Sequence, residues 1–124
     1  MSITYRIDPV ERLVYLTMAG DASYREWEGA MLAILADPSY RPGFDFLIDR
    51  RAAPAPTSDF IRRVVAFNRE HHQELGGGRA VVVGNTADFG MGRMAEILSE
   101  GEPSPIRAFT SLDEALRWLR AARR

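Results

Sequence analysis

The sequence predicts a single α/β domain over residues 1–124, with a mixed sheet of about five strands and four helices. Apolar residues recur with the period of a strand in some segments and of a helix in others, and the two kinds alternate along the chain. Two segments open with capping boxes, which mark helix N-termini. The predicted order is strand, strand, helix, strand, helix, strand, helix, strand, helix, so an antiparallel hairpin precedes a parallel core.

The first two strands form the expected hairpin at the edge of the sheet. Residues 3–8 alternate between apolar and polar side chains, as a strand with one solvent-facing side does. Asp8 and Pro9 suit the first two positions of a type I turn. Residues 12–18 are rich in Leu, Val, Tyr and Thr, and two such runs joined by a short turn favour an antiparallel pair.

The first helix is bounded on both sides by sequence signals. Ser23 and Glu26 have the spacing of a capping box, and Asp37-Pro38 ends the helix near residue 36. Its predicted buried face consists of five side chains at helical spacing: Tyr24, Trp27, Met31, Ile34 and Leu35.

Three further segments have the composition of strands in a parallel sheet. Residues 44–49 contain a short apolar run, residues 80–83 are apolar without alternation, and residues 106–109 form a shorter candidate. Strands of parallel sheets have this pattern because helices cover both of their faces.

Helical periods fill the intervals between these strands. Residues 59–75 carry apolar side chains and His71 on one face, and three glycines that follow them signal the end of a helix. Residues 87–99 repeat Met and Leu at helical spacing. Ser111 and Glu114 form the second capping box and open the last helix.

The composition excludes several classes of function. Sixteen Arg against seventeen acidic residues give a net charge of -1, without the basic excess of nucleic-acid-binding proteins. The chain has no Cys for a disulfide, thiol nucleophile or Cys-bound metal, and no Lys for a Schiff base or a P-loop. The N-terminus lacks a signal-peptide pattern, and the longest uncharged apolar stretch, residues 29–36, is too short to span a membrane. We therefore expect a cytoplasmic protein.

Four motifs and their order resemble the STAS fold of anti-sigma-factor antagonists, and more closely the small stand-alone bacterial SpoIIAA-like proteins. The motifs are LTMAG at residues 16–20, FLIDRR at 46–51, FGMGRM at 89–94, and Phe109 followed by EALRWL at 114–119. The resemblance spans nearly the whole chain. It implies a SpoIIAA-like (STAS) fold and a non-enzymatic regulatory or protein-interaction module, with folds that carry apolar ligands as a looser comparison.

One motif of the signalling antagonists is altered in this chain. They carry an Asp-Ser-Ser/Thr-Gly-type sequence at the start of the second helix, where a kinase phosphorylates a Ser, whereas residues 53–59 read APAPTSD without the Gly. Thr57 and Ser58 place hydroxyl groups at about that position, and Ser58 is the candidate phosphorylation site. Helix capping, a routine role of Ser and Thr, is the favoured interpretation.

A candidate ligand site lies at the carboxyl edge of the predicted sheet. Strand carboxyl ends and helix N-termini meet there, and this geometry favours negatively charged ligands. The expected contributors to an anion site are seven residues: Arg50, Arg51, Thr57, Ser58, Asn85, Thr86 and Arg93. Asp49 and Asp88 oppose an anion there, and an ion pair between Asp49 and an Arg is an equally good interpretation.

The residues leave two functions open: the regulatory or interaction module, and a small carrier of an apolar or lipid-like ligand beneath the Met- and Phe-rich helices. An enzyme ranks third because no nucleophile–base motif is present. The side chains of His71 and His72, adjacent on a helix, point in directions about 100° apart and cannot coordinate one metal ion from one face of the helix. We predict no cofactor, metal or nucleic-acid partner, and a homodimer, because an exposed edge of the first strand is usually paired or covered.

Overall fold

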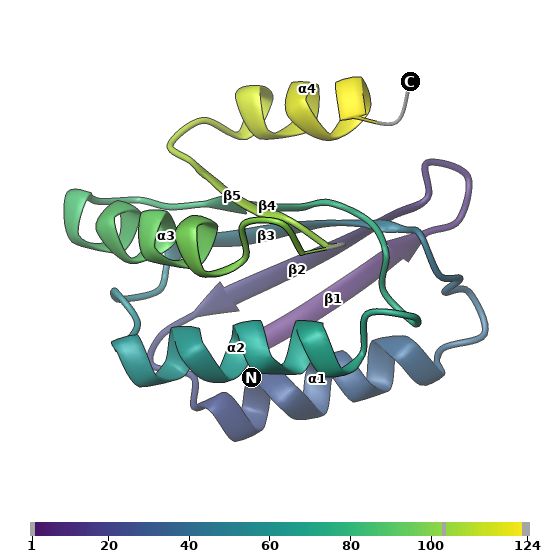
Figure 1. The fold of residues 1–124 in the computed structure, drawn as a ribbon, viewed down its shortest axis with the longest axis horizontal. Helices are drawn as coiled ribbons and strands as arrows, with labels where there is room; N and C mark the ends of the chain where they lie inside the picture. Colours follow the sequence, from purple (N-terminus) through teal and green to yellow (C-terminus); the bar gives the residue numbers. More distant parts are fainter. Residues whose placement is uncertain (1, 103, 123–124) are drawn as a thin grey trace.

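The computed structural model describes residues 2–102 and 104–122, and its elements follow the predicted order (Figure 1). The described residues form five strands: β1 (Ile3–Asp8), β2 (Leu13–Ala19), β3 (Asp45–Ala52), β4 (Arg79–Val82) and β5 (Ile106–Phe109). They also form four helices: α1 (Tyr24–Ala36), α2 (Ser58–Glu70), α3 (Thr86–Leu98) and α4 (Leu112–Ala122).

The five strands make one mixed sheet in the order β1-β2-β3-β4-β5. β1 pairs antiparallel with β2, and the other three neighbouring pairs are parallel. The predicted edge hairpin and parallel core are therefore confirmed. Since β2 to β5 run in the same direction, their carboxyl ends meet at one edge of the sheet, and β1 is an edge strand.

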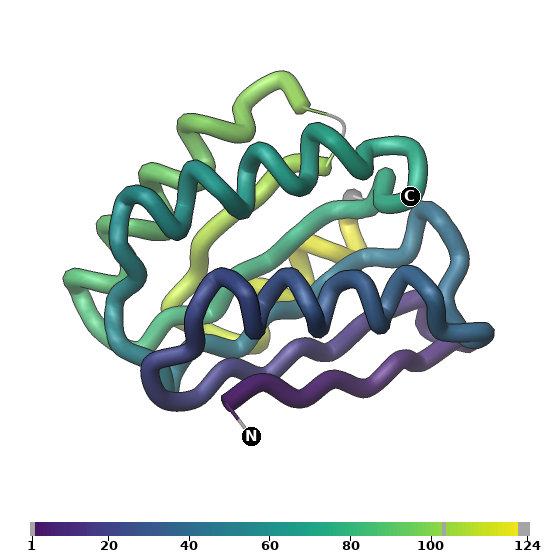
Figure 2. Tube along the Cα trace, turned by 90° about the horizontal axis from the view of Figure 1, so that it is seen from below, coloured from purple at the N-terminus to yellow at the C-terminus, as the bar shows by residue number. Residues whose placement is uncertain are grey.

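Three helices cover one face of the sheet, and α4 covers the other. Figure 2 shows α1, α2 and α3 across the near face, and Figure 1 shows α4 on the opposite side of the sheet. Strand alternation divides the core in the same way. Phe46 packs with Trp27 and Met31 on the three-helix side, while Leu47, its neighbour on β3, packs with Leu119 of α4. Within the described residues, no helix is long and apolar enough to cross a membrane.

Both predicted capping boxes begin helices in the structure. Ser23 Oγ accepts a hydrogen bond of 3.1 Å from the Glu26 backbone N–H, and the Glu26 carboxylate accepts one of 3.2 Å from the Ser23 N–H. Ser111 Oγ accepts a bond of 3.3 Å from the Glu114 N–H at the start of α4. These bonds satisfy donors that a helix N-terminus otherwise leaves free.

The second helix is shorter than the predicted 59–75. It ends at Glu70, and His71 is its C-cap, followed by a turn. Leu75 is nevertheless buried, and its carbonyl accepts a hydrogen bond of 2.6 Å from Gly43 N–H. The prediction of the helix end was wrong because this segment leaves the helix to join the loop that precedes β3.

The third strand is longer than the predicted 44–49. β3 continues to Ala52 because β2 runs beside it, with Ala19 opposite Ala52. Arg50 and Arg51 therefore lie within the strand, and its alternation turns their side chains to opposite faces of the sheet. Arg50 is buried and Arg51 is exposed.

Candidate functional site

Two arginines face the apolar interior between the sheet and the three helices. In the parallel register, Arg79 at the start of β4 lies opposite Phe46 of β3. Arg50 lies four residues beyond Phe46, so alternation turns both arginines toward the same face. At about 3.3 Å per residue, they are attached about 13 Å apart along the strand direction.

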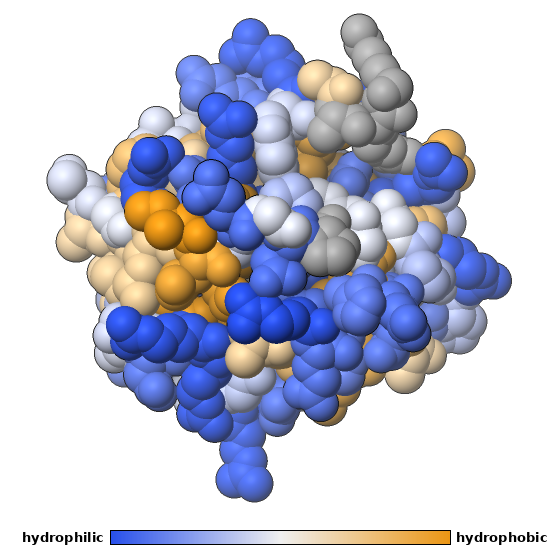
Figure 3. Space-filling view, in the orientation of Figure 1, coloured by the Kyte–Doolittle hydropathy of each residue, from blue (hydrophilic) through white to orange (hydrophobic). Residues whose placement is uncertain are grey.

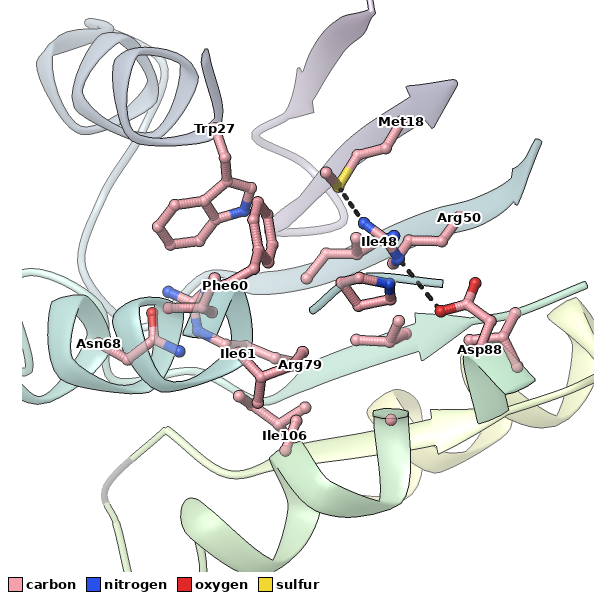
Figure 4. A pocket seen from close by; sticks show the side chains of 16 residues that line it. Met18, Trp27, Ile48, Arg50, Phe60, Ile61, Asn68, Arg79, Asp88 and Ile106 are labelled. Atoms are coloured by element: carbon pink, nitrogen blue, oxygen red, sulfur yellow. Dashed lines mark hydrogen bonds and ion pairs between the residues drawn. The ribbon is translucent and has the colours of Figure 1, made fainter. Parts of the chain in front are cut away.

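An internal pocket lies between these two positions, bounded by the sheet, α2 and α3. Its volume is about 50 Å³, and Figure 4 shows the side chains that line it. Most of the lining is apolar, including Ile48, Ile61 and Val81. One water needs about 10–15 Å³ of such space, so the pocket holds about three to five water-sized groups.

The surface nearby is also apolar. Figure 3, drawn in the orientation of Figure 1, shows hydrophobic surface gathered over α3 and the space between α3 and α2, bordered by hydrophilic side chains. Ile97 of α3 is exposed, and Met91 and Met94 are half-buried against the core. Apolar surface of this kind favours contact with the apolar part of a ligand or partner.

Arg79 is the most unusual residue of the pocket. Its relative exposure is 1%, and none of its three side-chain nitrogens has a hydrogen-bond acceptor among the described residues. Its guanidinium carbon lies 4.4 Å from the ring centroid of Phe46. Burial lowers the pKa of Arg79 to about 10, an effect that nearby Tyr40 opposes. Arg79 therefore keeps its charge at neutral pH.

Asn68 of α2, at the same end of the pocket, is also buried without hydrogen-bond partners among the described residues. Its relative exposure is 6%, and neither its amide nitrogen nor its oxygen has a partner among the described residues. Figure 4 shows Asn68 and Arg79 close together at one end. More than about 90% of buried polar groups in proteins are hydrogen-bonded, so two such neighbours form an exception.

The opposite end of the pocket is closed by Arg50 and Asp88. Arg50 Nε lies 3.5 Å from Asp88 Oδ1, and the same guanidinium donates to the Pro54 carbonyl at 2.8 Å and contacts Met18 Sδ at 3.3 Å. Asp88 Oδ2 has no partner among the described residues. Burial raises the pKa of Asp88, and the charge of Arg50 opposes this effect. Polar residues thus stand at both ends of the pocket, and apolar side chains line the space between them.

The residues predicted to form the edge site are divided among separate places. Arg51, Asn85 and Thr86 border one shallow depression, but Arg51 is already paired with Asp49 at 2.8 Å. That hydrogen bond lowers the pKa of Asp49, and the predicted Asp49–Arg ion pair is therefore present. Asn85 caps α3 by accepting from the backbone N–H of Asp88 at 2.7 Å.

The remaining predicted residues lie elsewhere. Arg50 and Thr57 border a second depression, where the N-termini of α1 and α2 meet. Thr57 is the N-cap of α2, and Ser58 is exposed in its first turn. Arg93 lies 2.6 Å from Glu96 and borders a third depression beside Trp118. The seven residues do not line a common pocket, and an anion site at the edge stays a prediction.

Sequence reasoning missed both Arg79 and Asn68. Arg79 follows three glycines, and nothing in its local sequence distinguishes it from an exposed loop residue. Asn68 offered a weak signal, because it stands four and seven residues after Val64 and Ile61, on the buried stripe of α2. His71, by contrast, lies 2.9 Å from Glu74, and the described residues contain no cluster of three potential metal ligands.

No protein-family model matches this chain, and no curated protein matches it. Among solved structures, it is similar to an uncharacterised protein of the DUF3478 family with a SpoIIAA-like fold from Shewanella loihica PV-4. The TM-score is 0.62 over 94% of this chain and 91% of that one, at 17% sequence identity. At this identity, the likeness shows the fold and not an activity. The chain therefore has a SpoIIAA-like α/β fold, as predicted.

Proposed function

We propose that this protein is a non-enzymatic ligand-binding module that takes a small organic anion into the pocket between α2, α3 and the sheet. The sequence left open, as an alternative, a carrier of an apolar ligand. The present proposal is that carrier function, for a ligand that also has a negatively charged group. The observation that supports it is Arg79, a charged and buried guanidinium without a hydrogen-bond acceptor among the described residues.

The energetics of Arg79 favour an occupant of opposite charge. The effective cost of burying an unpaired ion is several kcal/mol, even after the protein relaxes. The contact with the Phe46 ring offsets about 1–2 kcal/mol of that cost. A bound anion supplies the missing acceptors and a compensating charge, in a site where the low dielectric strengthens both.

The described lining of the pocket is suited to binding. Among the described residues that line it, none is Ser, Thr, Tyr or His. Asp88 is the single carboxylate among them, and Arg50 faces it. A nucleophile beside a general base is the minimum for covalent chemistry, and the described lining residues do not provide this combination.

We propose that the regulatory role implied by the STAS resemblance also acts through this pocket. A ligand that binds only the folded protein stabilises it by RT ln(1 + [L]/Kd), about 2.7 kcal/mol when the ligand is at one hundred times its Kd. The stabilised elements are those around the ligand, α2, α3 and β4. A partner that contacts these elements would sense the occupied state.

The test is an NMR titration of the ¹⁵N-labelled full chain with sodium nitrate, acetate and butyrate, each against chloride at equal ionic strength. We expect at least one of the three anions to shift the Asn68 side-chain amide and the Arg79 Nε–H signals in a saturable way. Arg79→Met should abolish the saturable shifts, and Arg107→Met, at an exposed arginine of β5, should preserve them. The absence of saturable shifts with all three anions, or their persistence in Arg79→Met, would refute the proposal.

A further inference from the structure

The pocket also specifies what kind of anion it takes. We propose that the ligand is a short-chain aliphatic monocarboxylate of about two or three carbons, held by its carboxylate at Arg79 and Asn68 with its alkyl group along Ile48 and Val81. This inference rests on the function proposed above, and it names the chemical class, the orientation and the length limit of the ligand.

The unpartnered atoms at the Arg79 end match a carboxylate. A guanidinium presents two parallel N–H groups that a carboxylate accepts with both oxygens, a geometry that single-atom anions cannot use. The Asn68 side-chain amide nitrogen supplies two further N–H donors. A carboxylate at this place therefore provides acceptors for N–H groups of Arg79 and for the Asn68 amide N–H groups, which have none in the described chain.

The walls between the two ends require an apolar tail. Ile48, Ile61, Val81 and Ile106 line this part of the pocket. Each methylene buried against such walls raises affinity about fourfold, so a carboxylate with an alkyl chain outcompetes nitrate or formate.

The far end of the pocket sets the length limit and excludes a second charge. Arg50 is engaged by Asp88 and by the Pro54 carbonyl, so it is not available to a second carboxylate. The carboxylate of Asp88 also repels a second carboxylate on the ligand. The space for about three to five water-sized groups is filled by the four or five heavy atoms of acetate or propionate, and longer chains meet the Arg50–Asp88 pair. Dicarboxylates and long-chain fatty acids are therefore excluded.

The experiment is calorimetric titration of the full chain with the straight-chain series from acetate to octanoate, with nitrate and succinate for comparison. We expect affinity to rise about fourfold from acetate to propionate, to reach its maximum at about two or three carbons, and then to fall with longer chains. Arg79→Lys keeps the charge but loses the planar pair of donors, and should weaken the best ligand by at least about tenfold.

Two matched variants test the position of the alkyl chain. Val81→Ala enlarges the pocket wall and should move the maximum to a longer chain. Val82→Ala removes the same volume from the next residue of β4, which packs on the α4 side, and should leave the maximum unchanged. If Val81→Ala does not fold, Ile48→Val makes a smaller opening in the same wall.

The outcomes separate this inference from the proposed function. Nitrate binding at Arg79 as tightly as the best carboxylate, or an equal change in chain-length preference in both valine variants, would overturn the inference and leave the anion pocket standing. Continuous improvement up to octanoate would overturn the length limit and therefore the inference. Failure of every anion to bind at Arg79 would overturn both.

Discussion

Replacing Arg79 by Met should make the ligand-free protein more stable. The variant removes a buried charge and keeps an unbranched side chain that fills much of the same space. Burial lowers the pKa of Arg79 from its ordinary value to about 10, which corresponds to about 3 kcal/mol against the charged form in the folded protein. The variant also loses the contact between the guanidinium and the Phe46 ring, which reduces the expected gain in stability by about 1–2 kcal/mol. We therefore expect the free energy of unfolding to rise by about 1–2 kcal/mol.

The measurement is urea unfolding, followed by circular dichroism and by tryptophan fluorescence, in a buffer without organic anions. In thermal unfolding, the same gain should raise Tm by about 3–12 °C for a domain of this size. Arg107→Met is the matched control, because Arg107 is exposed on the neighbouring strand, and its effect should stay within about 0.5 kcal/mol.

A loss of stability in Arg79→Met of about 1 kcal/mol or more, without ligand, would refute the reasoning. Such a loss would mean that the guanidinium of Arg79 already has hydrogen-bond acceptors in the ligand-free folded protein. With a saturating carboxylate present, the wild type should become more stable than Arg79→Met. Binding adds RT ln(1 + [L]/Kd) to the free energy of unfolding of the wild type and adds nothing to that of the variant.

Three further predictions concern charge, backbone and assembly. Burial raises the pKa of Asp88, so the folded protein binds this proton more readily than the unfolded chain does. As the pH falls through that raised pKa toward 3.8, the free energy of unfolding of the wild type should therefore increase relative to that of Asp88→Asn. Urea unfolding of both proteins at a series of pH values measures this difference. A difference that does not change with pH would contradict the prediction. Gly29→Ala, at an open position within α1, should stabilise by about 0.5–1 kcal/mol in urea unfolding. Gly77→Ala should destabilise by about 1–3 kcal/mol or more, because the new Cβ would overlap the Phe44 carbonyl; equal effects of the two changes would count against this packing. Finally, the exposed edge β1 leads us to expect the mass of a homodimer by light scattering, and a monomeric mass at high concentration would exclude it.

The sequence alone determined the elements whose signals are local. Ser23 with Glu26 and Ser111 with Glu114 mark helix starts because the capping bonds join residues three apart. The alternation of residues 3–8 and the apolar run of residues 80–83 predict a strand with one solvent-facing side and a buried strand in the same way. The order of these elements, together with the four motifs, was sufficient for the resemblance to the SpoIIAA-like fold.

Only the tertiary structure decided which polar side chains are buried. Arg79 enters the core because β4 pairs with β3 in a register that sets it opposite Phe46, and a shift by one residue would turn it to the other face. The extension of β3 beside β2 separates Arg50 from Arg51, which the sequence had placed in one site. Strand register and strand length are set by contacts between segments far apart in the chain, so no local pattern reveals a pocket that depends on them.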